Sequence, residues 1–351
     1  MKYTFLLLLL FTGCSLFTPA LHETQDLTFK NKDGLNFTGT LYTPKTAPPY
    51  PLLVLAHGSG NFKRNSKPYA VYGKYFSDHG IAVFLFDKRG IGDSDGNYSD
   101  ETYYLDSLSS DLTSAYEFIQ SSPLIDSKRA GILGVSQGGW VIPLALQNIK
   151  SISYVVSVSG PSIPPYLSDL TYDADQYRKE GYTDSEITEI IDYNRIISEY
   201  VGNFKDREKA IAVKKKYSER PWFKKLGFRS TLSPEDTLRL SKYDHYRREM
   251  FDPAPYWNKP EVPTLTIFGA KDAHIPVDTC MKRFDYIFRK NKYSDYTIKE
   301  FKNLGHIMQR VEGEKEVMNH NLMMMINGFP EPDEEYLQYV EKWIKSKPGV
   351  K

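Results

Sequence analysis

Apolar and polar positions alternate in two different ways along this chain. Continuous apolar runs at residues 51–56 and 81–87 are typical of strands buried on both faces of a sheet. From Leu35 to Thr43, apolar and polar residues alternate instead, which predicts a half-buried edge strand. Further strands are expected at four other places, residues 130–135, 153–159, 264–268 and 296–301.

Segments with helical spacing separate these strands. Aromatic side chains recur at helical spacing from Lys67 to His79, before a glycine suited to ending a helix. An apolar stripe runs through residues 105–119, and further helices are expected at 139–147 and through 337–344. Strand–helix–strand alternation of this kind predicts a parallel sheet covered by helices.

The alternation stops between residues 166 and 258, a segment bracketed by prolines at both ends. Within it, Thr183 and Glu186 form a capping-box pattern before a run of isoleucines, and the sequence Ser233-Pro-Glu-Asp236 has the features of a second helix start. A structureless loop of this length is improbable in a folded domain. We therefore expect residues 166–258 to form a helical insertion, a cap, in a catalytic domain made of residues 35–165 and 259–351.

The N-terminus carries an export signal. Lys2 is followed by an apolar run that is too short to span a bilayer, which takes ~20 apolar residues. The run ends in Thr12-Gly-Cys14, which resembles the bacterial lipoprotein signal, in which the cysteine is acylated and becomes the mature N-terminus. We expect residues 1–13 to be a signal peptide, Cys14 to be lipidated, and residues 14–34 to be a tether. A plain secretory signal with an incidental cysteine is the alternative.

Composition excludes several classes of function. The 45 basic and 44 acidic residues are interspersed, so the basic surface that a nucleic-acid-binding protein needs is missing. Cleavage after residue 13 removes one basic residue and leaves 44 of each sign, so membrane attachment would depend on the acyl chain. Two cysteines and seven scattered histidines give neither a disulfide scaffold nor a zinc motif, and no metal site is expected.

The strongest chemical signal is the sequence Gly134-Val-Ser136-Gln-Gly138, a Gly-x-Ser-x-Gly motif between a predicted buried strand and a predicted helix. In that context the turn raises the Ser136 hydroxyl above the sheet, and side chains at positions 134 and 138 would collide across the bend. Ser136 is thus the expected nucleophile. The backbone N–H of Gln137, at the helix N-terminus, is expected to stabilise an oxyanion.

A serine nucleophile needs a base and an acid that orients it. His306 lies in the loop after the strand at 296–301, and Asp272 in the loop after the strand at 264–268. The strand at 153–159 ends without a carboxylate, which leaves Asp272 as the acid. The order Ser136, Asp272, His306 is that of the α/β-hydrolase triad and differs from the chymotrypsin and subtilisin orders.

Two other histidines follow strands. His57 begins the sequence His57-Gly-Ser-Gly60, and this glycine-rich position suits an oxyanion loop better than a base. We assign the second oxyanion donor to the Ser59 backbone, with Gly60 as the alternative. His274 is expected at the rim of the site.

These motifs, together with Asp87-Lys-Arg-Gly90 and Asp93-Ser94, resemble those of the α/β-hydrolase superfamily, in particular an esterase-like bacterial branch with a helical cap. The resemblance covers nearly all of the mature chain. It implies a mostly parallel eight-stranded sheet with helices on both faces and a cap inserted after the sixth strand. It also implies no metal and no organic cofactor, and a structural role for the turn that contains Asp87 and Arg89.

The sequence therefore predicts a serine esterase that cleaves small carboxylic esters through an acyl-enzyme. An amidase, peptidase or thioesterase would use the same triad, and a surface lipoprotein that keeps the fold only as a binding scaffold is the non-enzymatic alternative. The signal predicts a protein exported and anchored to a bacterial envelope. Ser15 favours the outer membrane, and a periplasmic or secreted protein is the alternative location.

Overall fold

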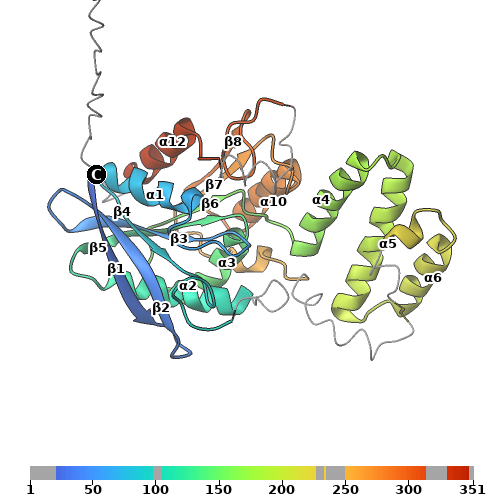
Figure 1. The fold of residues 1–351 in the computed structure, drawn as a ribbon, viewed down its shortest axis with the longest axis horizontal. Coiled ribbons are helices and arrows are strands. Elements are labelled where there is room, and N and C mark those ends of the chain that lie inside the picture. Colours follow the sequence, from blue (N-terminus) through green and yellow to red (C-terminus); the bar gives the residue numbers. More distant parts are fainter. Residues whose placement is uncertain (1–20, 98–104, 227–232, 235–249, 314–329, 348–351) are drawn as a thin grey trace, which may run out of the picture.

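A single eight-stranded sheet forms the centre of the molecule in the computed structural model (Figure 1). The structure describes residues 21–97, 105–226, 233–234, 250–313 and 330–347. The strands are β1 (His22–Lys30), β2 (Asn36–Pro44), β3 (Tyr50–Ala56), β4 (Ala82–Phe86), β5 (Ile125–Val135), β6 (Tyr154–Val158), β7 (Thr264–Gly269) and β8 (Tyr296–Phe301).

The strand order across the sheet is β1-β2-β4-β3-β5-β6-β7-β8. β2 pairs antiparallel with both β1 and β4, and every other pair is parallel. The predicted mostly parallel eight-stranded sheet is confirmed. Because the strands from β3 to β8 run in one direction, the loops that follow them meet at a single edge.

The N-terminal part of the sheet corrects two predictions. Residues 22–30 belong to β1 and are not part of a tether, and β2 lies between β1 and β4, so it is not an edge strand. β1 is the edge strand, and most of its side chains face solvent. Only Leu27 and Phe29 pack against the core, so the strand lacks an apolar pattern from which it could be recognised.

Helices cover both faces of the sheet (Figure 1). α1 (Lys67–Asp78) and α12 (Glu334–Lys345) pack on one face, and α2 (Leu105–Gln120), α3 (Gly138–Ala145) and α10 (Val277–Lys290) on the other. In β3, Leu52 and Val54 enter one of the two cores while Leu53 and Leu55 enter the other. This division explains why the central strands are apolar at successive positions.

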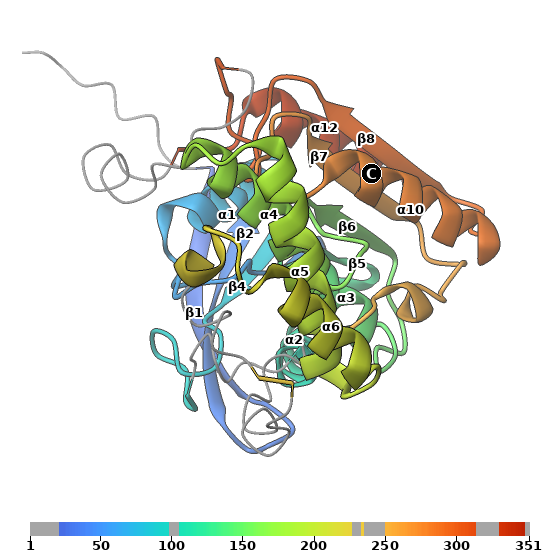
Figure 2. The ribbon, with the colours of Figure 1, turned by 90° about the vertical axis from the view of Figure 1, so that its right-hand side faces the viewer.

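Three helices follow the sixth strand and form a lobe beside the sheet (Figures 1 and 2): α4 (Pro165–Lys179), α5 (Asp184–Asn203) and α6 (Arg207–Tyr217). The capping box at Thr183 and Glu186 is present at the start of α5. The lobe has an apolar core of its own, which includes Tyr193, Trp222 and Phe223. A short 3₁₀ turn, Phe223–Leu226, follows α6, and another, Ala254–Tyr256, precedes β7. Of the second predicted helix start, Glu235 and Asp236 lie outside the described residues.

The predicted signal peptide and Cys14 also lie outside the described residues. Within the described ranges, no helix combines the length and the apolar character that a membrane span requires.

Candidate active site

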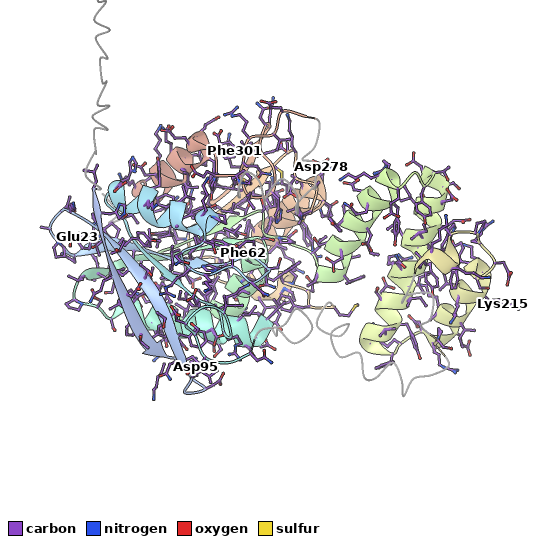
Figure 3. All side chains as sticks on the ribbon, in the orientation of Figure 1. Glu23, Phe62, Asp95, Lys215, Asp278 and Phe301 are labelled. Carbon is purple, nitrogen blue, oxygen red and sulfur yellow. The ribbon has the colours of Figure 1, made fainter. Side chains whose placement is uncertain are left out.

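The loops that follow β3, β5, β7 and β8 bring the predicted site residues to the carboxyl edge of the sheet. Figure 3 labels Phe62 in the loop after β3 and Asp278 at the start of α10, and both lie on the side of the body that faces the helical lobe. Glu23 and Asp95 lie far from the lobe in the same view. The ring of Tyr172 in α4 lies 5.9 Å from the ring of His274 in the loop after β7, so α4 lies next to this edge of the sheet.

Ser136 occupies a strained turn between β5 and α3. Its φ of 51° lies in the left-handed region, which is costly for a residue with a side chain. Its backbone N–H donates to the carbonyl of Val158 at 2.8 Å, which ties the turn to the next strand. In this conformation the side chain of Ser136 projects from the turn and belongs neither to β5 nor to α3.

Two glycines make the turn possible for different reasons. A Cβ at Gly134 would lie 2.9 Å from the carbonyl carbon and oxygen of Gly138, the predicted collision across the bend. A Cβ at Gly138 would instead lie 2.8 Å from the carbonyl oxygen of Ala56 in β3. Gly138 is thus needed because the helix start packs against a neighbouring strand, which the motif alone did not indicate.

Asp272 and His306 lie in two loops that are joined to each other. The backbone N–H groups of Ala270 and Lys271 donate to the carbonyls of Phe301 and Leu304 at 2.9 and 3.0 Å. A Cβ at Gly269 would lie 2.3 Å from the Leu304 oxygen, so only glycine permits this approach. The loop after β7 is consequently held against the loop after β8.

The structure brings the three predicted residues into one hydrogen-bonded chain. His306 Nε2 lies 2.9 Å from Ser136 Oγ, and His306 Nδ1 lies 2.7 Å from Asp272 Oδ2. The second oxygen of Asp272 accepts from the backbone N–H groups of His274 and Ile275, at 2.7 and 3.3 Å. Asp272 is 3% exposed and His306 is 8% exposed, so little water competes for these bonds.

His274 lies beside the base, at the rim of the site. Its ring stacks on that of His306 with 4.4 Å between the ring centroids, and the ring of Tyr172 from α4 lies 5.9 Å from His274 on a nearly parallel plane. The helical lobe thus approaches His306 through His274.

The loop after β3 approaches the nucleophile closely. A Cβ at Gly58 would lie 3.4 Å from the Cβ of Ser136, so the backbone of this loop lies against the serine. The N–H of Gly58 donates to Tyr69 Oη at 2.9 Å and is already used. The N–H of the next residue, Ser59, is the one we assign to the oxyanion, and Gly60, with a φ of 87°, forms the turn behind it.

Gln137 lies at the N-terminus of α3, directly after Ser136. Backbone N–H groups at a helix N-terminus have no acceptor within the helix, and the helix dipole favours negative charge there. Gln137 is 1% exposed and lines a small cavity with His57 and Lys88, and its backbone N–H is the group that we assign to the oxyanion.

The ring of His57, the residue before the expected oxyanion loop, packs against Tyr69. Its ring stacks on Tyr69 with the centroids 4.2 Å apart and the planes 7° from parallel. The pKa of His57 is lowered to about 3, chiefly by burial and next by the charge of Lys88, while a backbone hydrogen bond with Phe62 acts in the opposite direction. An imidazole that stays neutral and packs in this way fits the predicted role in the loop.

Two residues that the sequence analysis did not single out support the site. Ser159, with a φ of 48° at the end of β6, donates from its Oγ to the carbonyl of His306 at 2.7 Å. Lys88 donates from Nζ to the carbonyls of Gly58 and Gly60. The position of both directly after a buried strand, at the carboxyl edge of the sheet, was the only signal in the sequence.

The turn after β4 is held by ion pairs. Asp87 is fully buried and bonded to Arg64, and Arg89 forms a two-point contact with Asp111 at 2.7 and 2.8 Å. These contacts fit the structural role implied by the resemblance. Among the described residues, no group of three or more His, Cys, Asp or Glu side chains is placed to hold a metal ion.

Comparison with known proteins agrees with this geometry. Residues 47–173 match the family model described as serine aminopeptidase, S33. The α/β hydrolase GrgF from Penicillium sp. sh18 aligns with a TM-score of 0.54 at 17% identity, over 93% of this chain and 99% of that chain. The chain has the α/β-hydrolase fold. An esterase of Pyrococcus furiosus, Pf2001, shares this fold with a TM-score of 0.55 at 16% identity, over 93% and 92% of the two chains.

Curated relatives of this chain match over shorter stretches. The thiohydrolase aneE from Aspergillus aculeatus is 28% identical over 211 residues, which are 57% of this chain and 63% of that protein. The chain spans less than two thirds of the length of aneE and of two other curated relatives. The family-model match includes Ser59, Ser136 and Gln137 and ends before Asp272 and His306.

Proposed function

We propose that this protein is a serine hydrolase that cleaves carboxylic esters through an acyl-enzyme. The observation that carries the proposal is the chain of two hydrogen bonds from Ser136 through His306 to buried Asp272, with Ser136 in a left-handed turn. A nucleophile, a base within hydrogen-bond reach of it and an acid that orients the base are what covalent acyl transfer requires.

In the first half of the reaction, Ser136 Oγ attacks the acyl carbonyl carbon while His306 Nε2 takes the hydroxyl proton. The carbonyl oxygen becomes an oxyanion between the N–H groups of Gln137 and Ser59. When the tetrahedral intermediate collapses, His306 gives the proton to the leaving oxygen, and an alcohol departs from acylated Ser136.

In the second half, water takes the place of the alcohol. His306 removes a proton from the water as its oxygen attacks the acyl carbon, and the collapse of the second intermediate returns that proton to Ser136 Oγ. The carboxylic acid is released and the site is restored. Asp272, bonded to His306 Nδ1, stabilises the imidazolium formed in both halves.

A panel of three butyryl compounds tests the substrate class: butyryl groups joined to the same benzyl group through oxygen, sulfur or nitrogen. We expect kcat/KM for the oxygen ester to exceed that for the amide by at least 10²-fold, because an amine is a much poorer leaving group than an alcohol. A thioester rate above the ester rate would instead favour a thiohydrolase, the activity named for the Aspergillus relative.

Two other outcomes of these assays would favour a peptidase or a non-enzymatic protein. Faster hydrolysis of aminoacyl amides than of any ester would favour a peptidase, the activity in the family model's description. No hydrolysis of any compound, together with no labelling by a fluorophosphonate probe, would contradict an enzymatic role and support the scaffold alternative.

We also propose that the protein is exported and anchored through acylated Cys14 in a bacterial envelope. Expressed in bacteria fed an alkyne-bearing palmitate, the wild type is expected to carry the label and to sediment with membranes, and C14A is expected to do neither. C280A is the matched control, since the Cys280 thiol is buried and burial raises its pKa to about 11. Label retained by C14A would contradict the anchor.

A further inference from the structure

A buried lysine lies behind the loop assigned to the oxyanion. Lys88 follows β4 and is only 5% exposed, so its charged ammonium group lies within the protein. Its Nζ donates to the carbonyl oxygen of Gly58 at 2.9 Å and to that of Gly60 at 2.7 Å. A cation so deeply buried is costly unless it is hydrogen-bonded, and the two carbonyls supply such bonds.

The contact with Gly58 acts on the neighbouring N–H through the geometry of the peptide bond. The carbonyl of Gly58 and the N–H of Ser59 belong to one planar trans peptide group, in which they point in opposite directions. When Lys88 holds the carbonyl, it therefore also fixes the direction of the Ser59 N–H. That N–H points away from Lys88.

The charge adds an electronic effect to this geometric one. A hydrogen bond from a cation to the carbonyl oxygen draws electron density from the peptide group and makes its N–H a stronger donor, as neighbouring hydrogen bonds polarise one another in a medium of low dielectric constant. The second contact, with Gly60, fixes the following turn. Together the two contacts fix the backbone before and after Ser59.

Lys88 lies beside residues from both segments that we expect to donate to the oxyanion. A small cavity of about 20 Å³ is lined by His57, Lys88, Asp111 and Gln137, together with apolar residues. His57 precedes the loop with the Ser59 donor, and Gln137 supplies the other donor. His57 stays neutral because burial lowers its pKa, so Lys88 does not share this space with a second positive charge.

We propose that Lys88 is a positioning residue for catalysis, which aims and polarises the Ser59 N–H toward the oxyanion through the Gly58 carbonyl. The proposal rests on the proposed function, since it requires an oxyanion to form above Ser136. It assigns the role to the lysine of the sequence Asp87-Lys-Arg-Gly90, in which Asp87 and Arg89 form structural ion pairs.

The test compares K88M with K347M in the full-length protein. Lys347 is also largely buried, at 9% exposed, and bonds both oxygens of Asp295 at 2.9 Å at a distance from the site, so K347M removes a similar charge without touching the loop. For the best ester of the panel, we expect K88M to lower kcat by roughly 10- to 100-fold, below the 10²–10³-fold loss typical when an oxyanion donor is removed outright. KM should change by less than about twofold, since the substrate carbonyl has little negative charge before the reaction.

A second readout separates positioning from general damage. A trifluoromethyl ketone with the same acyl chain forms an oxyanion when Ser136 adds to it, so its inhibition constant should rise in K88M by about the factor by which kcat/KM falls. K88R keeps a charge and several donors and is expected to recover part of the loss. K347M should leave kcat, KM and this inhibition constant unchanged.

The outcomes separate the two proposals. A wild type that hydrolyses esters and a folded K88M with unchanged kcat and inhibition constant would overturn the role of Lys88 alone. A wild type inactive on every acyl compound would overturn the proposed function. If K88M does not fold, K88R and K88Q decide: a higher kcat for K88R supports the role of the charge, and equal values for the two contradict it.

Discussion

The Ser136→Ala variant is expected to lower kcat for ester hydrolysis on the order of 10⁶-fold, because the residue that forms the acyl-enzyme is lost. In the structure the Ser136 hydroxyl lies 2.9 Å from His306 Nε2, so the expected base is already within hydrogen-bond reach of the hydroxyl proton. Covalent labelling by a fluorophosphonate should disappear in the same variant. Steady-state hydrolysis and gel fluorescence measure the two effects independently.

S114A is the matched control for this experiment. Ser114 is a buried serine within α2 whose hydroxyl bonds the carbonyl of Ser110 in the same helix at 2.9 Å, so its replacement removes a hydroxyl without changing a hydrogen bond of Ser136, Asp272 or His306. It should keep full activity and labelling. If S136A still formed a stable fluorophosphonate adduct, the nucleophile would lie elsewhere and the proposed mechanism would be wrong.

The central strands were predictable because burial on both faces leaves a pattern in the sequence. β3 and β4 are apolar at every position between their ends, and their bounds differ from the predicted ones by about one residue. β1 was not predictable in the same way. Its partner β2 has a buried face, but β1 exposes most of its own side chains and is held by backbone hydrogen bonds, which do not depend on side-chain type.

The meeting of Ser136, Asp272 and His306 was predictable because the chemistry expected of a triad restricts residue type and chain order together. Ser136, Asp272 and His306 each follow a strand of the parallel part of the sheet, and parallel strands bring such positions to one edge. Lys88 occupies an equivalent position, but it acts on backbone carbonyls of another loop. Any loop presents carbonyls, so nothing in the spacing between Lys88 and Gly58 marked the contact.

Replacement of Asp272 by asparagine should have the second largest effect, a loss of about 10⁴-fold in kcat, as expected when the base is held in the wrong tautomer. Asp272 Oδ1 accepts from the backbone N–H groups of His274 and Ile275, so an asparagine would place its carbonyl oxygen there. Its amide NH₂ group would then face His306 Nδ1, where the carboxylate oxygen now lies at 2.7 Å.

This arrangement reverses the hydrogen bond that orients the base. Nδ1 would have to accept from the amide, which moves the ring proton to Nε2, the nitrogen 2.9 Å from Ser136 Oγ. A protonated Nε2 cannot take the proton of the serine hydroxyl, so the nucleophile is present but not activated. Ester hydrolysis and the rate of fluorophosphonate labelling should therefore fall together, while Ser136 itself remains intact.

The matched control is D295N, in which a carboxylate that pairs with Lys347 is changed in the same way at a site remote from the triad. It should retain wild-type kcat, and a thermal unfolding curve for each variant separates loss of activity from loss of fold. The extent of fluorophosphonate labelling distinguishes the roles of Ser136 and Asp272. S136A should show neither labelling nor hydrolysis, whereas D272N should still be labelled to completion, only much more slowly. A D272N rate within tenfold of wild type would mean that Asp272 does not set the tautomer of His306, and that the buried 2.7 Å contact between them is structural.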